Sequence, residues 1–150
     1  MALSLAVQFV SKAKHLPSRV QVRRWVQAAH HASHDAVITI RYVDEREGRA
    51  LNLAFRKKDY ATNVLTFVHD QTGHATAEYA ADIVICAPVI AREAREQKKP
   101  VAAHHGHMVI HGMLHAQGLD HEIEADAAAM ENIEIAALRR FRIKNPYEIE

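Results

Sequence analysis

The chain has 150 residues, and its 19 Lys and Arg against 18 Asp and Glu give a formal net charge of +1 at pH 7 with histidine neutral. This length is typical of one domain that buries a sufficient core, and the near balance of charge means that affinity for a polyanion must come from a local patch. The single cysteine excludes an internal disulfide, and residues 1–10 are too short and lack the basic flank of an export signal. We expect a single domain over residues 1–150, cytoplasmic and without membrane contact.

The first half of the chain is predicted to form two strands, each followed by a helix. Apolar and polar residues alternate over 3–9, and β-branched residues are frequent over 36–43, as in strands. A helix is expected over 19–30, where apolar residues recur at helical spacing, and a second helix after Asp44, which can cap it. Near its C-terminal end, where the helix dipole favours positive charge, this second helix carries Arg56, Lys57 and Lys58.

The second half is predicted to be a hairpin followed by helices. Strands are expected over 63–68 and 83–86, joined by a long loop around a glycine. Three helices are expected after this hairpin, over 88–99, 101–116 and 124–140. Pro100 ends the first of them and opens the second, since proline is tolerated at the start of a helix. Strands first and helices later predict an α+β fold, a small sheet covered by helices.

Three histidines have the spacing HxxxHxxGxxH, which is that of a metal site. In a helix, His111 and His115 lie one turn apart on one face, where both can bind the same ion. Gly118 can then end the helix in a left-handed conformation, so that His121 folds back as a third ligand. Three imidazoles leave one tetrahedral position open, which is characteristic of a catalytic zinc site. The alternative is a His-rich helix whose imidazoles are satisfied in the core or at the surface.

The residue that follows the first of these histidines argues against one class of enzyme. Metzincin proteases share the spacing but have a glutamate there as general base, whereas this chain has Gly112. The motif therefore indicates a metal-dependent hydrolase that is not a metzincin-type peptidase. Asp120 either orients an imidazole or a water molecule or is simply a turn residue.

Other polar residues near the motif have structural interpretations as well as functional ones. We expect His107 to be a buried residue that packs beside or supports the ligands, and His104 and His105 to be exposed near the helix start. Asp82, at the start of the expected fourth strand, can cap that strand or be a carboxylate near the site. Arg56 can be part of a solvated helix end, or it can bind a phosphate through both arms of its guanidinium.

Three blocks of the sequence resemble the YbeY-type endoribonucleases, bacterial metalloproteins linked to ribosomal RNA maturation. The blocks are LNLAFRKKD with TNVLTF (51–59 and 62–67), DIVIC (82–86) and HMVIHGMLHAQGLDH (107–121). The resemblance implies a mixed sheet of about four strands with about five helices around it. It also implies that Arg56 is tied to nuclease activity and that one zinc ion per chain is bound by His111, His115 and His121.

We therefore expect a zinc-dependent, single-strand-specific endoribonuclease that acts in ribosomal RNA maturation and ribosome quality control. The zinc would lower the pKa of its bound water towards about 7 and present hydroxide to phosphorus. Arg56 would stabilise the phosphorane, and the proton would leave through solvent, Asp120 or a substrate oxygen. Single-strand preference rests on the resemblance alone, because the sequence shows no stacking platform of exposed aromatic residues.

The expected partners are single-stranded or ribosomal RNA and small-subunit proteins or associated assembly factors. Two alternatives stay open at this point. One is a zinc peptidase or other amide hydrolase, which would need a carboxylate base from outside the motif. The other is a ribosome-assembly factor that binds RNA without cleaving it and whose metal holds the fold.

Overall fold

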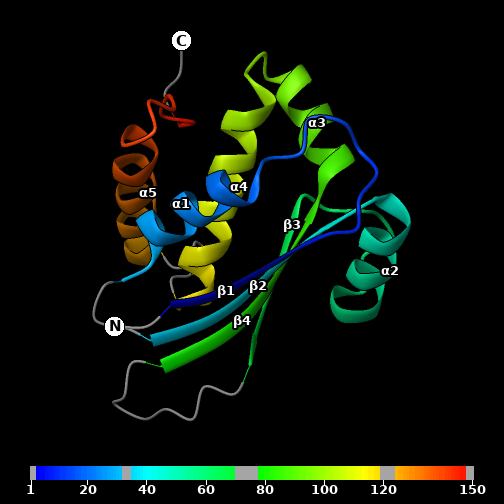
Figure 1. Cartoon of the computed structure of the whole chain (residues 1–150), viewed down its shortest axis with the longest axis horizontal. Coiled ribbons are helices and arrows are strands. Elements are labelled where there is room, and N and C mark those ends of the chain that lie inside the picture. Colours follow the sequence, from blue (N-terminus) through cyan, green and yellow to red (C-terminus); the bar gives the residue numbers. More distant parts are fainter. Residues whose placement is uncertain (1–2, 32–34, 70–77, 119–123, 148–150) are drawn as a thin grey trace.

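The computed structural model describes residues 3–31, 35–69, 78–118 and 124–147, and each predicted strand and helix is present in it (Figure 1). The elements are β1 (Leu3–Phe9), α1 (Arg19–Ala29), β2 (Asp35–Val43), α2 (Glu45–Arg56), β3 (Val64–His69), β4 (Glu78–Cys86), α3 (Ala87–Glu96), α4 (Val101–Ala116) and α5 (Glu124–Arg139). β4 begins five residues earlier than predicted because residues 78–82 also pair with β2. The predicted α+β class is confirmed.

The four strands form one mixed sheet in the order β1-β2-β4-β3. β1 pairs with β2 and β2 with β4 in parallel, whereas β3 runs antiparallel to β4, with Val64 opposite Ile85 and Phe67 opposite Asp82. The predicted hairpin is thus confirmed, and β3 is an edge strand of the sheet.

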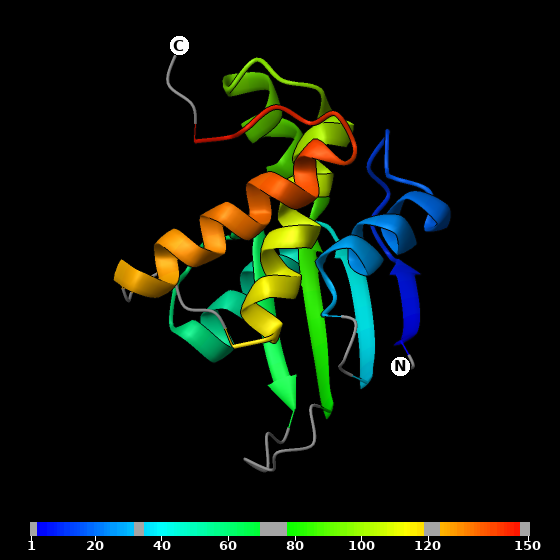
Figure 2. The same cartoon turned by 90° about the vertical axis from the view of Figure 1, so that its left-hand side faces the viewer.

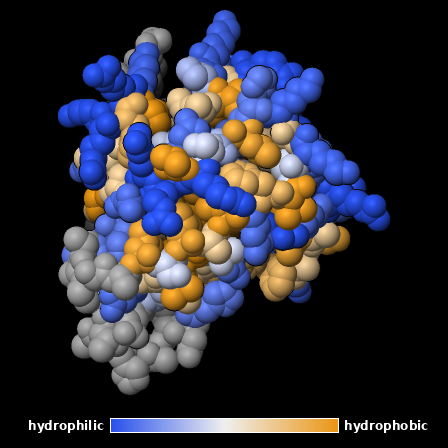
Figure 3. All heavy atoms as spheres, in the orientation of Figure 1, coloured by the Kyte–Doolittle hydropathy of each residue, from blue (hydrophilic) through white to orange (hydrophobic). Residues whose placement is uncertain are grey.

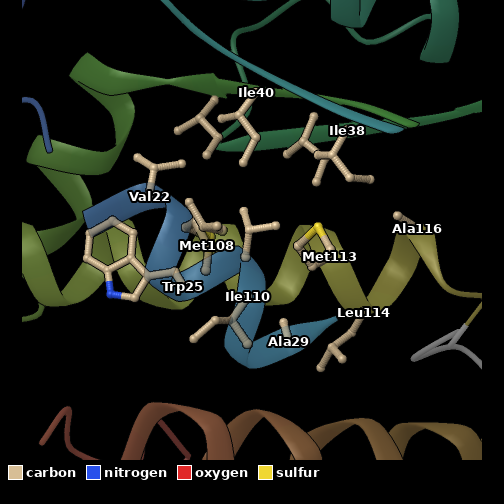
Figure 4. Packing of buried hydrophobic residues seen from close by; sticks show 14 of the residues in the cluster. Val22, Trp25, Ala29, Ile38, Ile40, Met108, Ile110, Met113, Leu114 and Ala116 are labelled. Atoms are coloured by element: carbon tan, nitrogen blue, oxygen red, sulfur yellow. The ribbon is translucent and has the colours of Figure 1, made fainter. Parts of the chain in front are cut away.

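Helices lie on both sides of the sheet, and one of them is central. α4 contacts α1, α3, α5 and the strands β3 and β4, while α2 packs over the opposite face of the sheet. Figure 2 shows α5 crossing α4 on the side that faces away from the strands. In Figure 4, Ile38 of β2 points towards Met113 of α4, and Leu114 lies on the side of α4 that faces α5.

The central position of α4 overturns one expectation. His104 and His105 are 2% and 1% exposed, not solvated, because α4 is surrounded by other elements even in its first turns. The Nε2 atom of His104 lies 2.8 Å from a carboxylate oxygen of Glu93 in α3. The ring of His105 packs against that of Tyr42, with 5.6 Å between the ring centroids.

Asp44 occupies the N-cap position of α2 as predicted, but its carboxylate makes no capping bond to the helix. It accepts hydrogen bonds from the Ser11 hydroxyl and, at 3.0 Å, from the backbone N–H of Lys12. The start of α2 is thereby tied to the segment that leaves β1.

The surface mixes hydrophilic and hydrophobic side chains on the face seen in Figure 3. None of the helices in the described ranges is both long enough and apolar enough to span a bilayer.

Candidate active site

The C-terminal half of α4 brings two of the predicted ligands together. α4 continues through residue 116, so His111 and His115 lie one turn apart on one face. Their Nε2 atoms lie 3.0 Å apart. Two nitrogen ligands of one tetrahedral zinc ion, each at about 2.0–2.1 Å from the metal, lie roughly 3.3 Å apart. The pair therefore fits a divalent ion, and its role as ligand remains a prediction.

A buried carboxylate that the sequence reading missed lies behind this pair. Glu134 of α5 has no exposed surface. One of its oxygens is hydrogen-bonded to Nδ1 of His111, and the other lies 3.3 Å from Nε2 of His107 and accepts a bond from the Tyr147 hydroxyl. The available sequence signal is its place in an apolar stripe of α5, four residues after Met130 and four before Leu138, both of which are buried.

The bond to Glu134 sets the tautomer that we assign to His111. An Nδ1–H that donates to a carboxylate leaves the lone pair on Nε2, which is the atom that faces His115. Ligand atoms of His107, His111 and Glu134 also lie within 4.8 Å of one another and could themselves hold an ion. The hydrogen bonds favour the Nε2 pair, because both oxygens of Glu134 are already engaged.

Glu134 is charged in this environment. Burial alone raises the pKa of its carboxyl, but hydrogen bonds from His107, His111 and Tyr147 outweigh burial and bring the pKa to about 2. Burial lowers the pKa of His107, so its imidazole is neutral at pH 7, as we expected of a buried supporting residue. The carboxylate is thus a fixed hydrogen-bond acceptor.

Gly112 lies where α4 approaches the sheet closely. A Cβ atom at this position would lie 3.0 Å from Cγ2 of Ile83 and 3.4 Å from Cγ2 of Val64. A glutamate here, as in a metzincin, would have to displace these side chains, because the position faces the sheet.

Gly118 has the positive φ that the sequence predicted, +93°, immediately after α4. The predicted third ligand His121 and the candidate Asp120 lie outside the described residues.

Arg56 shares a groove with the histidine pair. A cavity of about 680 Å³ is lined by His111 and His115 of α4, residues 62–68 along β3, and Phe55 and Arg56 at the end of α2. α2 ends there because Lys57 adopts the left-handed conformation, with φ 58°. Arg56 is exposed, and no carboxylate in the described ranges forms an ion pair with it. Its guanidinium is therefore available to an anion in the groove.

Asp82 lies on the opposite side of the sheet from the histidine pair. It lines a second cavity, of about 600 Å³, between α2 and the sheet. One of its oxygens lies 2.7 Å from Nε2 of His69 on the neighbouring strand. The structure does not bring Asp82 to the histidine groove. Asp82 does not cap a strand either, because β4 already begins at Glu78.

Comparisons with known proteins agree with the resemblance of the three sequence blocks. The family model described as Endoribonuclease YbeY matches residues 8–142. The Endoribonuclease YbeY of Thiobacillus denitrificans is 57% identical over 145 residues, which cover 97% of this chain and 96% of that protein. The protein of the same name from Cupriavidus pinatubonensis is 49% identical over 149 residues, which cover 97% of this chain and 72% of that protein.

A solved structure shares the fold. The solution structure of TM1509 from Thermotoga maritima matches with a TM-score of 0.57 at 22% identity, over 97% of this chain and 99% of that one. The relatives in sequence carry the name of an endoribonuclease, a hydrolase that acts on RNA, in agreement with the enzyme class that we predicted. With a family model that covers most of its length and relatives this similar, the chain belongs to the YbeY endoribonuclease family.

Proposed function

We propose that this chain is a zinc-dependent endoribonuclease of one catalytic domain, which cleaves single-stranded RNA in ribosomal RNA maturation and ribosome quality control. The observation that carries the proposal is the groove shared by His111, His115 and Arg56. RNA as substrate is suggested by the name that the relatives carry, endoribonuclease. We further propose a cytoplasmic location and contacts with the small ribosomal subunit or its assembly factors.

In this proposal the metal is held by imidazoles. His111 and His115 supply two nitrogen atoms, His121 is the proposed third ligand, and Glu134 keeps His111 in the tautomer whose Nε2 lone pair faces the site. A zinc ion held by these residues would supply Lewis acidity and lower the pKa of a bound water molecule.

Arg56 recognises and neutralises the phosphate. Its guanidinium can donate two parallel hydrogen bonds to the non-bridging oxygens, and it counters the negative charge that grows on them as a fifth oxygen approaches phosphorus. Glu134 does not receive the proton of the attacking water, because it is buried and both oxygens accept hydrogen bonds. The proton of that water leaves through solvent, a substrate oxygen or Asp120. The P–O bond to one ribose oxygen breaks, and this leaving oxygen takes up a proton from solvent.

The lining of the groove favours a phosphodiester over a peptide. The described residues that line it include a cation and two imidazoles but no carboxylate. A zinc peptidase needs a carboxylate base, and a glutamate at position 112 would be crowded against Ile83 and Val64 of the sheet. An anionic substrate would bind more tightly because of the positive charge of Arg56.

A single-turnover assay on an unstructured RNA tests the proposal. We expect Arg56→Ala to reduce cleavage about 100- to 1000-fold while retaining bound metal, and His115→Ala to lose both metal and cleavage. Arg49→Ala is a matched control, since Arg49 lies on the same helix, is paired with Asp59 and does not line the groove. We expect this control to cleave like the wild type.

Two outcomes would contradict the proposal. Equal trace cleavage by all four proteins would identify a contaminating nuclease. RNA binding without cleavage by the wild type, and persisting in folded His115→Ala, would support the assembly-factor alternative.

A further inference from the structure

Phe55 is the most exposed large apolar side chain among the described residues, with 65% of its surface accessible. It is the penultimate residue of α2 and directly precedes Arg56. Its ring lines the groove that holds His111 and His115, and it also lines the second cavity over the opposite face of the sheet. A large apolar group therefore stands at the boundary of two cavities.

The Phe55 ring is held by a second aromatic ring. It meets Phe67 of β3 in an edge-to-face contact, with 5.0 Å between the ring centroids and 66° between the ring planes. Phe67 is half-buried and packs on the apolar cluster beneath α2, which includes Leu65 and Val84. Such a contact restrains the orientation of Phe55 while leaving most of its surface open.

We propose that Phe55 is a stacking platform for an unpaired nucleobase next to the phosphate bound by Arg56. This inference rests on the proposed function and adds the source of single-strand preference. Every base has a π-face that can stack on an aromatic ring, so a platform of this kind accepts any sequence. A base inside a duplex is already stacked between its neighbours and cannot reach a side chain at a groove rim.

The surroundings of Phe55 fit a nucleotide. The next three residues in the chain, Arg56, Lys57 and Lys58, are all exposed cations that can meet backbone phosphates. The same groove is lined by Thr62, just before the edge strand β3, and by Thr66 within it, and both hydroxyl groups can donate to and accept from base edges. The site thus offers a face for the base, donors for its edge and cations for its phosphate.

A neighbouring residue supplies a matched control. Leu53 lies on the same helix and is 49% exposed, but it lines neither cavity. If exposed apolar surface on α2 were enough to bind RNA, replacing Leu53 would have the same effect as replacing Phe55.

The test uses the full chain loaded with zinc and an unstructured oligoribonucleotide that carries one 2-aminopurine. Stopped-flow fluorescence reads binding before cleavage, because stacking on an aromatic ring quenches the 2-aminopurine emission. Phe55→Leu keeps apolar bulk but removes the π-face, and Phe55→Tyr keeps the ring. We expect Phe55→Leu to lose the quenching and to bind the single strand roughly 5- to 150-fold more weakly, the range for one lost base stack.

The remaining proteins complete the design. Phe55→Tyr and Leu53→Ala should quench and bind like the wild type, and none of the changes should alter binding to a duplex of the same sequence. Emission from Trp25, which is buried in the core, reports whether each variant is folded.

The failures of the two proposals are distinguishable. Wild-type quenching and affinity in Phe55→Leu, with cleavage still dependent on Arg56, would overturn the stacking role and leave the nuclease intact. Equal weakening by Leu53→Ala would also overturn it. A wild-type protein that neither binds nor cleaves the RNA would overturn both proposals.

Discussion

Replacing Glu134 with glutamine asks whether its carboxylate prepares His111 for a metal. The carboxylate is bonded to three side chains, those of His107, His111 and Tyr147. Glutamine has the same shape but only one acceptor oxygen and one NH₂ group. The NH₂ group would therefore face at least one of the three side chains that now donate to the carboxylate. If the NH₂ group faces His111, Nδ1 must accept, and the ring proton moves to Nε2, the atom that faces His115.

The magnitude follows from this change of tautomer and from burial. Removing the carboxylate behind a ligating histidine commonly weakens metal binding 10- to 100-fold, or about 1.4 to 2.8 kcal/mol. Glu134 is 0% exposed, so a mispaired donor there cannot turn to water and keeps its desolvation cost. We therefore expect the upper part of this range, a rise in Kd for Zn²⁺ of about 30- to 100-fold.

Competition with a chromophoric chelator at pH 7 measures this change. Glu93→Gln is the matched control, because it alters a second carboxylate–histidine pair, between Glu93 of α3 and His104 of α4. Neither residue of this pair lines the groove. We expect this control to bind zinc within about 2-fold of the wild type, since no ligand depends on the pair. Wild-type affinity in a folded Glu134→Gln protein would refute the reasoning, and an equal loss in both variants would indicate general destabilisation.

Three further predictions concern stability. Zinc at 100 times its Kd should stabilise the chain by about 2.7 kcal/mol and raise Tm by about 5–10 °C in calorimetry, and an equal rise in His115→Ala would contradict the proposed site. Gly112→Ala should lower the free energy of unfolding in urea by about 1 kcal/mol, because crowding against Ile83 outweighs the gain in helix propensity. In an Ile83→Ala background the same change should instead raise it by about 1 kcal/mol, and the same loss in both backgrounds would show that crowding is not the cause. The hydrogen bond from the backbone N–H of Lys12 lowers the pKa of Asp44 below its ordinary value of 3.8. The contribution of this carboxylate to the free energy of unfolding is therefore present above pH 3.8 and is lost as the pH falls through the lower pKa of the folded state. Asp44→Ala should therefore cost about 1 kcal/mol at pH 7 and progressively less below pH 3.8, whereas a constant difference down to pH 3 would exclude this linkage.

Local sequence patterns were sufficient to predict the helices and strands. The spacing of apolar residues, and the residues that begin or end an element, act within a few positions along the chain. The apolar residues at helical spacing in the first helix, Val22, Trp25, Val26 and Ala29, are all buried, and α4 has the predicted bounds. Contacts between distant segments were not accessible in this way. Glu131 and Glu134 are alike in sequence, yet only Glu134 is buried, because α5 packs on α4 along that face. The same limit explains the wrong expectation for His104 and His105 and the unnoticed exposure of Phe55.

Three sides of α4, which face the sheet, α5 and the groove, have separate roles in the proposed chemistry. Gly112 faces the sheet, Glu134 approaches Nδ1 of His111 from α5, and the imidazoles of His111 and His115 line the groove. The carboxylate that orients the proposed ligand His111 is thereby kept out of the groove, where it would repel a phosphate. A phosphodiester bound there meets Arg56 and two imidazoles but no anionic side chain among the described lining residues. Catalysis in such a groove depends more on neutralising charge at phosphorus than on a protein base, so loss of Arg56 should cost more than loss of Asp120.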